Sequence, residues 1–348
     1  MLTPIWERVL QQASVGVHDN FFDLGGDSTL ALELFTEIAR VTGREIPPVM
    51  IYQSPTLSEL AAALDQPSLP RFVPLVALKA GTENPSLFIT HGMGGNVMDF
   101  FQVVKYMRTD RPIYGMQAKG FDGVEEPFER IEDMAQFFLD AIREVQPQGP
   151  YLLAGYSLGG LVALEMAQRL RAAGERVALL ALVESYPHKR YLARIQRAKL
   201  FFQRLRLRAA ALWRLRPQAA YAYLRNPAER MAPVSCDDQR GPAKLPLDVW
   251  FTPAILRMRD RAYLALQRYR PRFYPDKISF VRAEIPTEFP RDAAACWKRL
   301  AADFEIATAP GDHRTIMNTY FSELAEALSK YLDSALGGGR SGTAGLGL

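Results

Sequence analysis

Cysteine is scarce in this chain. Only two cysteines, Cys236 and Cys296, occur among 348 residues. Two cysteines cannot build a disulfide framework, and no other metal ligands stand near them at a metal-binding spacing. We therefore expect neither a disulfide-stapled secreted domain nor a metal centre, and the cytosol is the expected compartment.

Long apolar runs are also missing. The longest, such as Val177–Val183, are far shorter than the about 20 residues that a membrane-spanning helix needs. Met1–Leu10 has neither a basic stretch nor a small-residue cleavage site, so no signal peptide is expected. Hydrophobic residues make up 48% and charged residues 23% of the chain, which is ordinary for a globular protein of two or three domains.

Charge is spread unevenly, although the net charge is only +4. The segment His188–Arg272 holds 20 Lys/Arg and 5 Asp/Glu, a local charge of +15. Residues 1–66 hold 3 basic and 9 acidic side chains, a charge of −6. The basic segment is therefore a candidate partner for the acidic front or for a phosphate-bearing group, and a solvated cationic surface is the alternative.

Residues 1–66 predict a small all-α unit. Apolar residues recur at helical spacing in Pro4–Leu10, and further helices are expected from Ser28 to Gly43 and over Leu57–Leu64. Because the chain starts inside the first of these helices, we expect it to be part of a longer protein. Residues 67–71 follow with prolines and no periodicity, which predicts a linker.

From residue 72 to 336, short apolar runs alternate with longer amphipathic ones, which predicts an α/β domain with a mostly parallel sheet. The expected strands are Phe72–Leu78, Leu87–Thr90, Ile113–Gln117, Tyr151–Ala154, Val177–Val183, Lys277–Val281 and Phe304–Ala307. The expected helices are Met98–Met107, Ile131–Val145, Leu158–Ala173 and Thr315–Leu332. An Arg-rich, mostly helical insertion from Tyr191 to about Arg272 interrupts the alternation. The Gly-rich tail 337–348 is expected to be disordered.

Ser157 lies in a pattern typical of an enzyme nucleophile. Gly155-Tyr156-Ser157-Leu158-Gly159 follows the apolar run Tyr151–Ala154 and precedes an amphipathic helix. Between a strand and a helix, G-x-S-x-G forms a turn so sharp that only small residues fit at the flanking positions, and it lifts the serine hydroxyl clear of the sheet. The pattern predicts a nucleophile elbow. The alternative is a tight turn with an N-cap serine.

A serine hydroxyl needs a base, and the chain has four histidines. In this fold the chain order is serine, acid, histidine, which removes His18 and His91. His313 lies in a short loop after the last expected strand, where such a base is found. We therefore prefer His313 to His188.

The acid of such a triad follows a strand between Ser157 and His313. Glu184 directly follows the expected strand Val177–Val183, at the carboxyl end of a parallel strand. We prefer Glu184 for this position. The competing acids are Asp276, Asp303 and Asp312.

Acyl transfer also needs donors for the developing oxyanion. The N–H of Leu158, directly after the nucleophile, is one candidate, and the N–H of Met93 in the glycine-rich run His91–Asn96 is the other. A glycine-permitted turn and a phosphate cradle are alternatives for this run. Because no Gly-Lys-Ser/Thr follows, a nucleotide P-loop is not expected.

Ser28 ends the run Val17–Ser28, which closes with Asp23-Leu24-Gly25-Gly26-Asp27-Ser28. With Tyr52–Leu57, this run makes residues 1–66 resemble a peptidyl carrier domain of nonribosomal peptide synthetases. The resemblance implies that Ser28 bears a 4′-phosphopantetheine arm, attached by a phosphopantetheinyl transferase, whose thiol holds the growing chain. Thr29 departs from the family, which usually has a bulky apolar residue there.

Residues from about 71 to 335 resemble the type I thioesterase domains that end such synthetases. The resemblance is carried by His91–Gly95, the Gly155 elbow, Trp297 and Gly311–His313. The interval from Ser157 to Glu184 also matches, although the family normally has Asp in place of Glu184. The resemblance implies an α/β-hydrolase domain in which residues 186–275 form the lid over an acyl pocket.

Together the two resemblances predict chain release. The acyl or peptidyl thioester on Ser28 passes to Ser157, with His313 as base and the N–H groups of Leu158 and Met93 at the oxyanion. Upstream synthetase domains are expected partners, whereas nucleic acid and membranes are not. Hydrolysis, macrocyclisation and transesterification remain open, as do a thioesterase-like binding module and an esterase fused to an unrelated helical domain.

Overall fold

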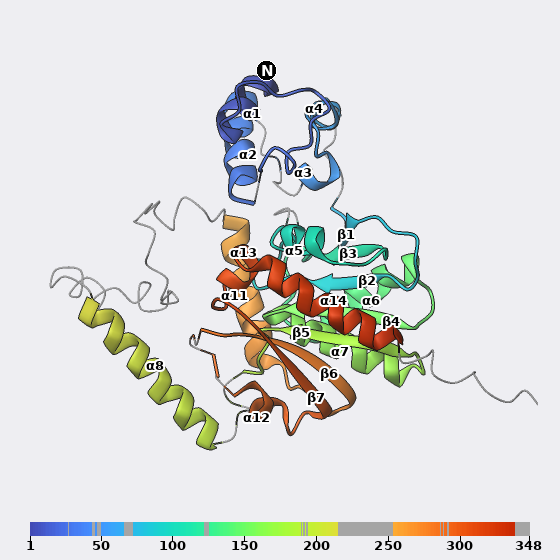
Figure 1. The fold of residues 1–348 in the computed structure, drawn as a ribbon, viewed down its shortest axis with the longest axis vertical. Helices are drawn as coiled ribbons and strands as arrows, with labels where there is room; N and C mark the ends of the chain where they lie inside the picture. The colour runs from blue at the N-terminus through green and yellow to red at the C-terminus, as the bar shows by residue number, and fades with distance from the viewer. Residues whose placement is uncertain are drawn as a thin grey trace, which may run out of the picture.

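The computed structural model describes residues 1–26, 28–43, 46, 50–65, 72–121, 125–188, 190, 192, 194–214, 253–285, 287, 289, 290 and 292–337. A small helical domain stands on a larger α/β domain (Figure 1). In the described ranges, no helix has both the length and the apolar character needed to cross a membrane. The domain boundaries remain predictions, because the linker and residues 338–348 lie outside the described residues.

The small domain has its own apolar core. Trp6 is fully buried and meets the ring of Phe21 edge-on, with 5.3 Å between ring centroids. Thr56 and Glu59 form a capping box that starts the last helix, each side chain accepting the other's backbone N–H. The short third helix was not predicted, because four residues are too few to show a helical period. The helices are α1 (Leu2–Leu10), α2 (Ser28–Thr42), α3 (Met50–Gln53) and α4 (Leu57–Leu64).

The larger domain is built on one sheet in the order β1-β3-β2-β4-β5-β6-β7. β1 is antiparallel to β3, and all other neighbours are parallel, which confirms the predicted mostly parallel sheet. All the predicted strands are present, with ends shifted by a few residues. They are β1 (Leu75–Lys79), β2 (Leu87–Thr90), β3 (Ile113–Met116), β4 (Tyr151–Tyr156), β5 (Val177–Val183), β6 (Tyr274–Ala283) and β7 (Ala301–Ala309).

Helices cover both faces of this sheet. Because strand side chains alternate in direction, Leu153 packs into the core beneath α6 and α7, whereas Leu152 packs beneath α5 and α14. The loops at the carboxyl ends of the parallel strands therefore lie between the helices that cover the two faces of the sheet. The helices are α5 (Phe100–Tyr106), α6 (Ile131–Val145), α7 (Leu158–Ala172) and α14 (Phe321–Gly337), with the short α12 (Ala293–Trp297) beside β7.

The prediction of a single helix over Thr315–Leu332 is wrong. The segment forms α13 (Thr315–Asn318) and then α14, and the chain leaves the helical path between them. A Cβ placed on Gly311 would lie 2.4 Å from the ring of Tyr320, so this ring packs directly on the loop that follows β7. The contact between Tyr320 and Gly311 therefore lies at the break between α13 and α14, and the helical pattern of the sequence does not reveal it.

Within the expected insertion, the structure describes the helices α8 (Arg194–Arg214) and α11 (Pro253–Arg268). Two arginines of α11, Arg261 and Arg268, pair with Glu129 of the sheet domain, and Arg268 Nη1 lies 2.6 Å from Glu129 Oε2. Figure 1 shows α11 against the sheet domain and α8 reaching outward. Among the described residues, no ion pair joins this basic insertion to the acidic first domain, so that predicted attraction has no contact to support it there.

Candidate active site

Ser157 lies at the turn between β4 and α7. Its φ of 54° and ψ of −117° are a strained conformation for a residue with a side chain. A Cβ on Gly155 would come within 2.3 Å of the Gly159 carbonyl oxygen, and one on Gly159 within 2.2 Å of the His91 carbonyl oxygen. The side chain of Ser157 makes no capping hydrogen bond, which contradicts the N-cap alternative. The geometry is that of the predicted elbow.

His313 lies in the loop after β7. Its Nδ1 is 3.2 Å from Oε2 of Glu184, 129 residues earlier in the chain. The imidazole packs against the rings of Tyr156 and Phe289, with centroid distances of 5.0 and 4.4 Å. The Tyr156 hydroxyl also donates to the backbone carbonyl of His313. Because Nδ1 faces the carboxylate, Nε2 is the nitrogen left to exchange a proton with a nucleophile.

Glu184 directly follows β5 and is 3% exposed. Its Oε2 faces His313, and its Oε1 accepts hydrogen bonds from the Ala283 N–H at 2.8 Å and the Tyr186 hydroxyl at 3.3 Å. Burial, together with the nearby Glu184 carboxylate, raises the pKa of Tyr186, so this hydroxyl stays a donor. The longer acid is thus accommodated with both oxygens engaged, as a buried carboxylate requires.

The competing acids are engaged elsewhere. Asp276 Oδ2 lies 2.7 Å from Arg171 Nε, and Asp303 accepts the N–H of the residue that follows it. Asp312 accepts two backbone N–H groups within its own turn, at 2.9 and 2.8 Å. Of the candidate acids, Glu184 is the one that the structure brings to the imidazole of His313.

The two predicted oxyanion donors come from segments that pack together. Leu158 is the first residue of α7, where backbone N–H groups have no partner within the helix. Met93 lies in a turn in which the Gly95 N–H donates to the Gly92 carbonyl at 3.2 Å. A Cβ on Gly92 would lie 2.9 Å from the ring of Tyr156, so this turn rests on the elbow. The role of either N–H at an oxyanion stays a prediction.

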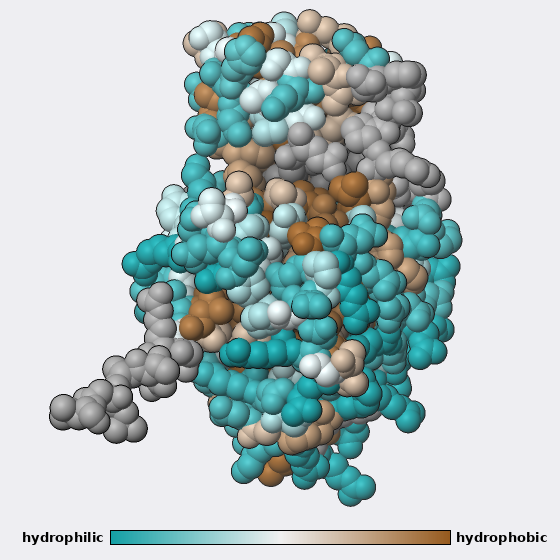
Figure 2. Space-filling model, turned by 90° about the vertical axis from the view of Figure 1, so that its right-hand side faces the viewer, coloured by the Kyte–Doolittle hydropathy of each residue, from teal (hydrophilic) through white to brown (hydrophobic). Residues whose placement is uncertain are grey.

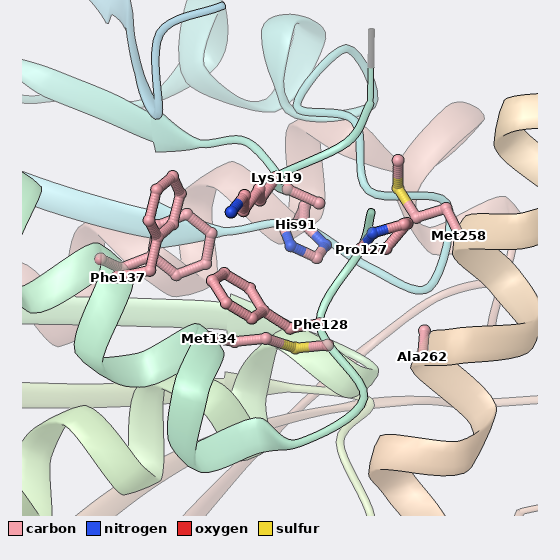
Figure 3. Close-up of a pocket in the computed structure, with 10 residues that line it drawn as sticks. His91, Lys119, Pro127, Phe128, Met134, Phe137, Met258 and Ala262 are labelled. Atoms are coloured by element: carbon pink, nitrogen blue, oxygen red, sulfur yellow. The ribbon is translucent and has the colours of Figure 1, made fainter. Parts of the chain in front are cut away.

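A largely apolar pocket adjoins the same turn. In Figure 3, His91 stands in the middle, with Phe128 and Phe137 on one side and Met258 of α11 on the other. His91 is buried, and burial lowers its pKa to about 4, so the ring is neutral near pH 7. Its Nδ1 lies within hydrogen-bond distance of the Gly92 carbonyl, while Nε2 has no hydrogen-bond partner among the described residues. The sequence placed His91 in the glycine-rich run and excluded it as the base, but it did not predict this pocket.

Two regions of the chain match known protein families. Residues 2–64 match the family model described as "Phosphopantetheine attachment site", and residues 85–208 match the one described as "Thioesterase domain". The chain is a carrier domain followed by a thioesterase domain. The carrier domain is the part of the molecule to which phosphopantetheine is attached covalently.

The relatives of this carrier–thioesterase chain include nonribosomal peptide synthetases. A dimodular nonribosomal peptide synthase of Bacillus subtilis (strain 168) is 38% identical over 189 residues, which are 54% of this chain and 8% of that protein. Malpibaldin synthetase of Mortierella alpina is 36% identical over 187 residues, which are 53% of this chain and 3% of that protein. The chain thus spans only a small part of the length of these relatives.

Solved structures share the fold. A four-domain nonribosomal peptide synthetase, crystallised in its holo form with AMP and glycine, aligns with 96% of this chain at a TM-score of 0.57 and 24% identity, over 26% of its own length. ClbQ, from the colibactin NRPS/PKS pathway, aligns with 73% of this chain at a TM-score of 0.52 and 14% identity, over 98% of its own length. The predicted carrier and α/β-hydrolase folds are confirmed.

In the carrier domain, Ser28 is the first residue of α2. The turn before it is closed by the Gly26 N–H, which donates to the Phe21 carbonyl at 2.9 Å. Asp23 and Gly25 nearby are exposed. A start of a helix next to an exposed turn suits the phosphodiester of a 4′-phosphopantetheine arm, because helix N-termini favour phosphate.

The carrier meets the thioesterase domain at α5. The ring of Phe22 stacks on Phe101, with centroids 4.0 Å apart and an interplanar angle of 28°. Asp23 pairs with Lys105 at 3.6 Å, and Met98, 8% exposed, belongs to the carrier's apolar core. Figure 2 shows apolar residues gathered at this junction. The contact begins directly after the glycine-rich turn that contains Met93, so it lies beside the candidate site.

Proposed function

We propose that this chain releases an acyl or peptidyl group by transferring it from the carrier to Ser157. Ser28 is the proposed attachment residue, and 4′-phosphopantetheine, when bound there, supplies a thiol that holds the acyl group as a thioester. Upstream synthetase domains would build that group. The single observation that carries the proposal is the His313–Glu184 pair, with Nδ1 and Oε2 3.2 Å apart, in a domain whose serine occupies a strained elbow.

The residues divide the first half of the reaction between them. Nε2 of His313 removes the Ser157 proton, Oγ attacks the thioester carbonyl, and Glu184 stabilises the resulting imidazolium. The N–H groups of Leu158 and Met93 donate hydrogen bonds to the carbonyl oxygen as its negative charge develops. When the carbon–sulfur bond breaks, His313 gives its proton to the departing sulfur. An ester of the acyl group on Ser157 remains.

The second half regenerates the serine. His313 removes a proton from the acceptor as the acceptor attacks the ester carbonyl. When the ester bond to Ser157 breaks, His313 gives this proton to Ser157 Oγ. Water as the acceptor gives a free acid, whereas a nucleophile within the bound chain gives a macrocycle. The pocket of His91, Phe128, Phe137 and Met258 offers apolar walls, and we place an apolar part of the acyl group against them.

Intact-protein mass spectrometry of the loaded chain tests this function. The apo chain is loaded with an acyl-coenzyme A and a phosphopantetheinyl transferase, and its mass is followed over time. The wild type should gain the loaded arm and then lose the acyl group. Ser157→Ala should keep the acyl group, and Ser28→Ala should never gain the arm.

The product mass separates hydrolysis from cyclisation, because a macrocycle is lighter than the free acid by one water. Labelling of Ser157 by a serine-reactive fluorophosphonate separates an active enzyme from a thioesterase-like binding module. Release by Ser157→Ala at the wild-type rate would contradict the proposal. Loading of the Ser28→Ala chain would instead move the attachment site and leave the thioesterase assignment intact.

A further inference from the structure

The ring of Phe289 contacts His313 and also Tyr186, the residue that donates a hydrogen bond to Glu184. The Phe289 ring lies 4.4 Å from the imidazole of His313 and 5.5 Å from the ring of Tyr186, centroid to centroid. Tyr186 in turn donates its hydroxyl to Oε1 of Glu184. One side chain therefore supports the base directly and the acid through Tyr186.

Phe289 belongs to no helix or strand, so its position depends on tertiary contacts. Its backbone N–H donates to the Thr287 hydroxyl at 3.3 Å. The side-chain amide of Gln203 donates to two carbonyls of the same segment, that of Thr287 at 2.5 Å and that of Phe289 at 2.8 Å. A single amide thus holds the segment that carries the ring.

Gln203 lies on α8, which otherwise turns much of its surface to solvent. Phe201 and Phe202 are 64% and 61% exposed, and Leu205 is 53% exposed, whereas Gln203 is partly buried against the thioesterase domain. The amide of Gln203 is therefore a defined attachment of this outward-reaching helix to the neighbourhood of His313.

We propose that Gln203 and Phe289 are positioning residues that link α8 to the catalytic pair. Gln203 fixes the positions of Thr287 and Phe289, and the Phe289 ring then limits the orientations open to His313 and Tyr186. The placement of α8 is thereby coupled to the rate at which Ser157 is acylated. This inference rests on the proposed function, in which His313 is the base.

The test uses the whole chain with three readouts, namely acylation of Ser157 by a fluorophosphonate, kcat and KM for a soluble acyl thioester, and the downfield proton NMR signal of the His313 Nδ1–H. A misplaced base slows chemistry steeply, so Phe289→Ala should lower kcat by about 10- to 100-fold with KM little changed. Gln203→Glu, which has the same shape but no amide donor, should lower kcat in the same direction. Both should shift or broaden the Nδ1–H signal.

Two matched variants guard the interpretation. Phe289→Tyr keeps the ring and should restore kcat and the NMR signal, and Arg197→Ala, on the exposed surface of α8, should leave both unchanged. Wild-type kcat and an unshifted Nδ1–H signal in Phe289→Ala would overturn the link. Full acylation in His313→Ala would overturn the proposed function instead, so the two failures are distinguishable.

Discussion

Ser28 and Ser157 each stand at the start of an α-helix that follows glycines, but their surroundings differ. Ser157 has a strained backbone with φ of 54°, and its N–H is held by the Val183 carbonyl at 2.9 Å. Ser28 opens α2 after a turn in which Asp23 and Gly25 are exposed and Gly26 is buried. In the proposed function, Ser157 attacks and needs neighbours held in place, whereas Ser28 is modified and needs access.

His313→Ala should separate the two serines most strongly. Removing the base should lower acylation of Ser157 by roughly 10⁴-fold or more, because the hydroxyl loses its proton acceptor. Attachment of phosphopantetheine at Ser28 should be unchanged. Mass spectrometry of the same sample reports both serines, and normal turnover in this variant would mean that the base lies elsewhere.

Substitutions of Glu184 should have the next largest effect. Glu184→Ala leaves Nδ1 of His313 without its acceptor and should lower kcat by about 10²- to 10⁴-fold. Glu184→Asp should retain activity, because the carboxylate is kept. Steady-state kinetics with a soluble acyl thioester measures both. Insensitivity of kcat to Glu184→Ala would move the acid to another residue.

His91 should make the stability of the thioesterase domain depend on pH. The pKa of His91 is about 4 in the folded protein, where it is buried, and 6.5 in its ordinary state. Between pH 6.5 and pH 4, His91 is therefore protonated in the unfolded chain but neutral in the folded chain. Stability is therefore lost as the pH falls from 6.5 to 4, by up to about 3 kcal/mol. Urea unfolding at several pH values should show a flatter dependence in His91→Gln, and an identical dependence would contradict this account.

The junction between the domains should give the smallest effect. Phe101→Ala removes the stack with Phe22 and should slow transfer from the carrier several-fold, while leaving turnover of a soluble thioester unchanged. The exposed ion pair of Asp23 and Lys105 stabilises the junction less than the stack of Phe22 and Phe101 does, by at most about 1 kcal/mol. Lys105→Glu should slow transfer slightly, and Asp23→Lys in the same chain should restore it. Equal slowing of both substrates would mean that α5 itself is damaged.

Much of the fold was predictable because its signals are local. The strand at Val177–Val183 is a buried apolar run, and the turn at Ser157 is bounded by glycines at set positions, so neighbouring residues carry the information. The break between α13 and α14 was not predictable, since Tyr320 packs on Gly311 from outside the helical pattern. Local periodicity does not record contacts that the chain makes only after folding.

The candidate site divides in the same way. The sequence predicts Ser157, Glu184 and His313 as site residues, because each follows an expected strand. The roles of Tyr186 and Phe289 could not be found in this way, because neither belongs to a motif, and Phe289 reaches His313 from a segment without regular structure. Their only signal is proximity in the folded protein.

The sequence by itself determined the order of the two domains and the sharp turn at Ser157, and it predicted His313 as the base, because glycine sterics and the strand–loop–helix order act over a few residues. The sequence favoured Glu184 as the acid, but only the tertiary structure shows that it meets the imidazole of His313, since the two residues are 129 positions apart in the chain. The tertiary structure also decided that Phe101 carries the contact with Phe22. Contacts between distant residues depend on how whole layers pack, and no short pattern contains that information.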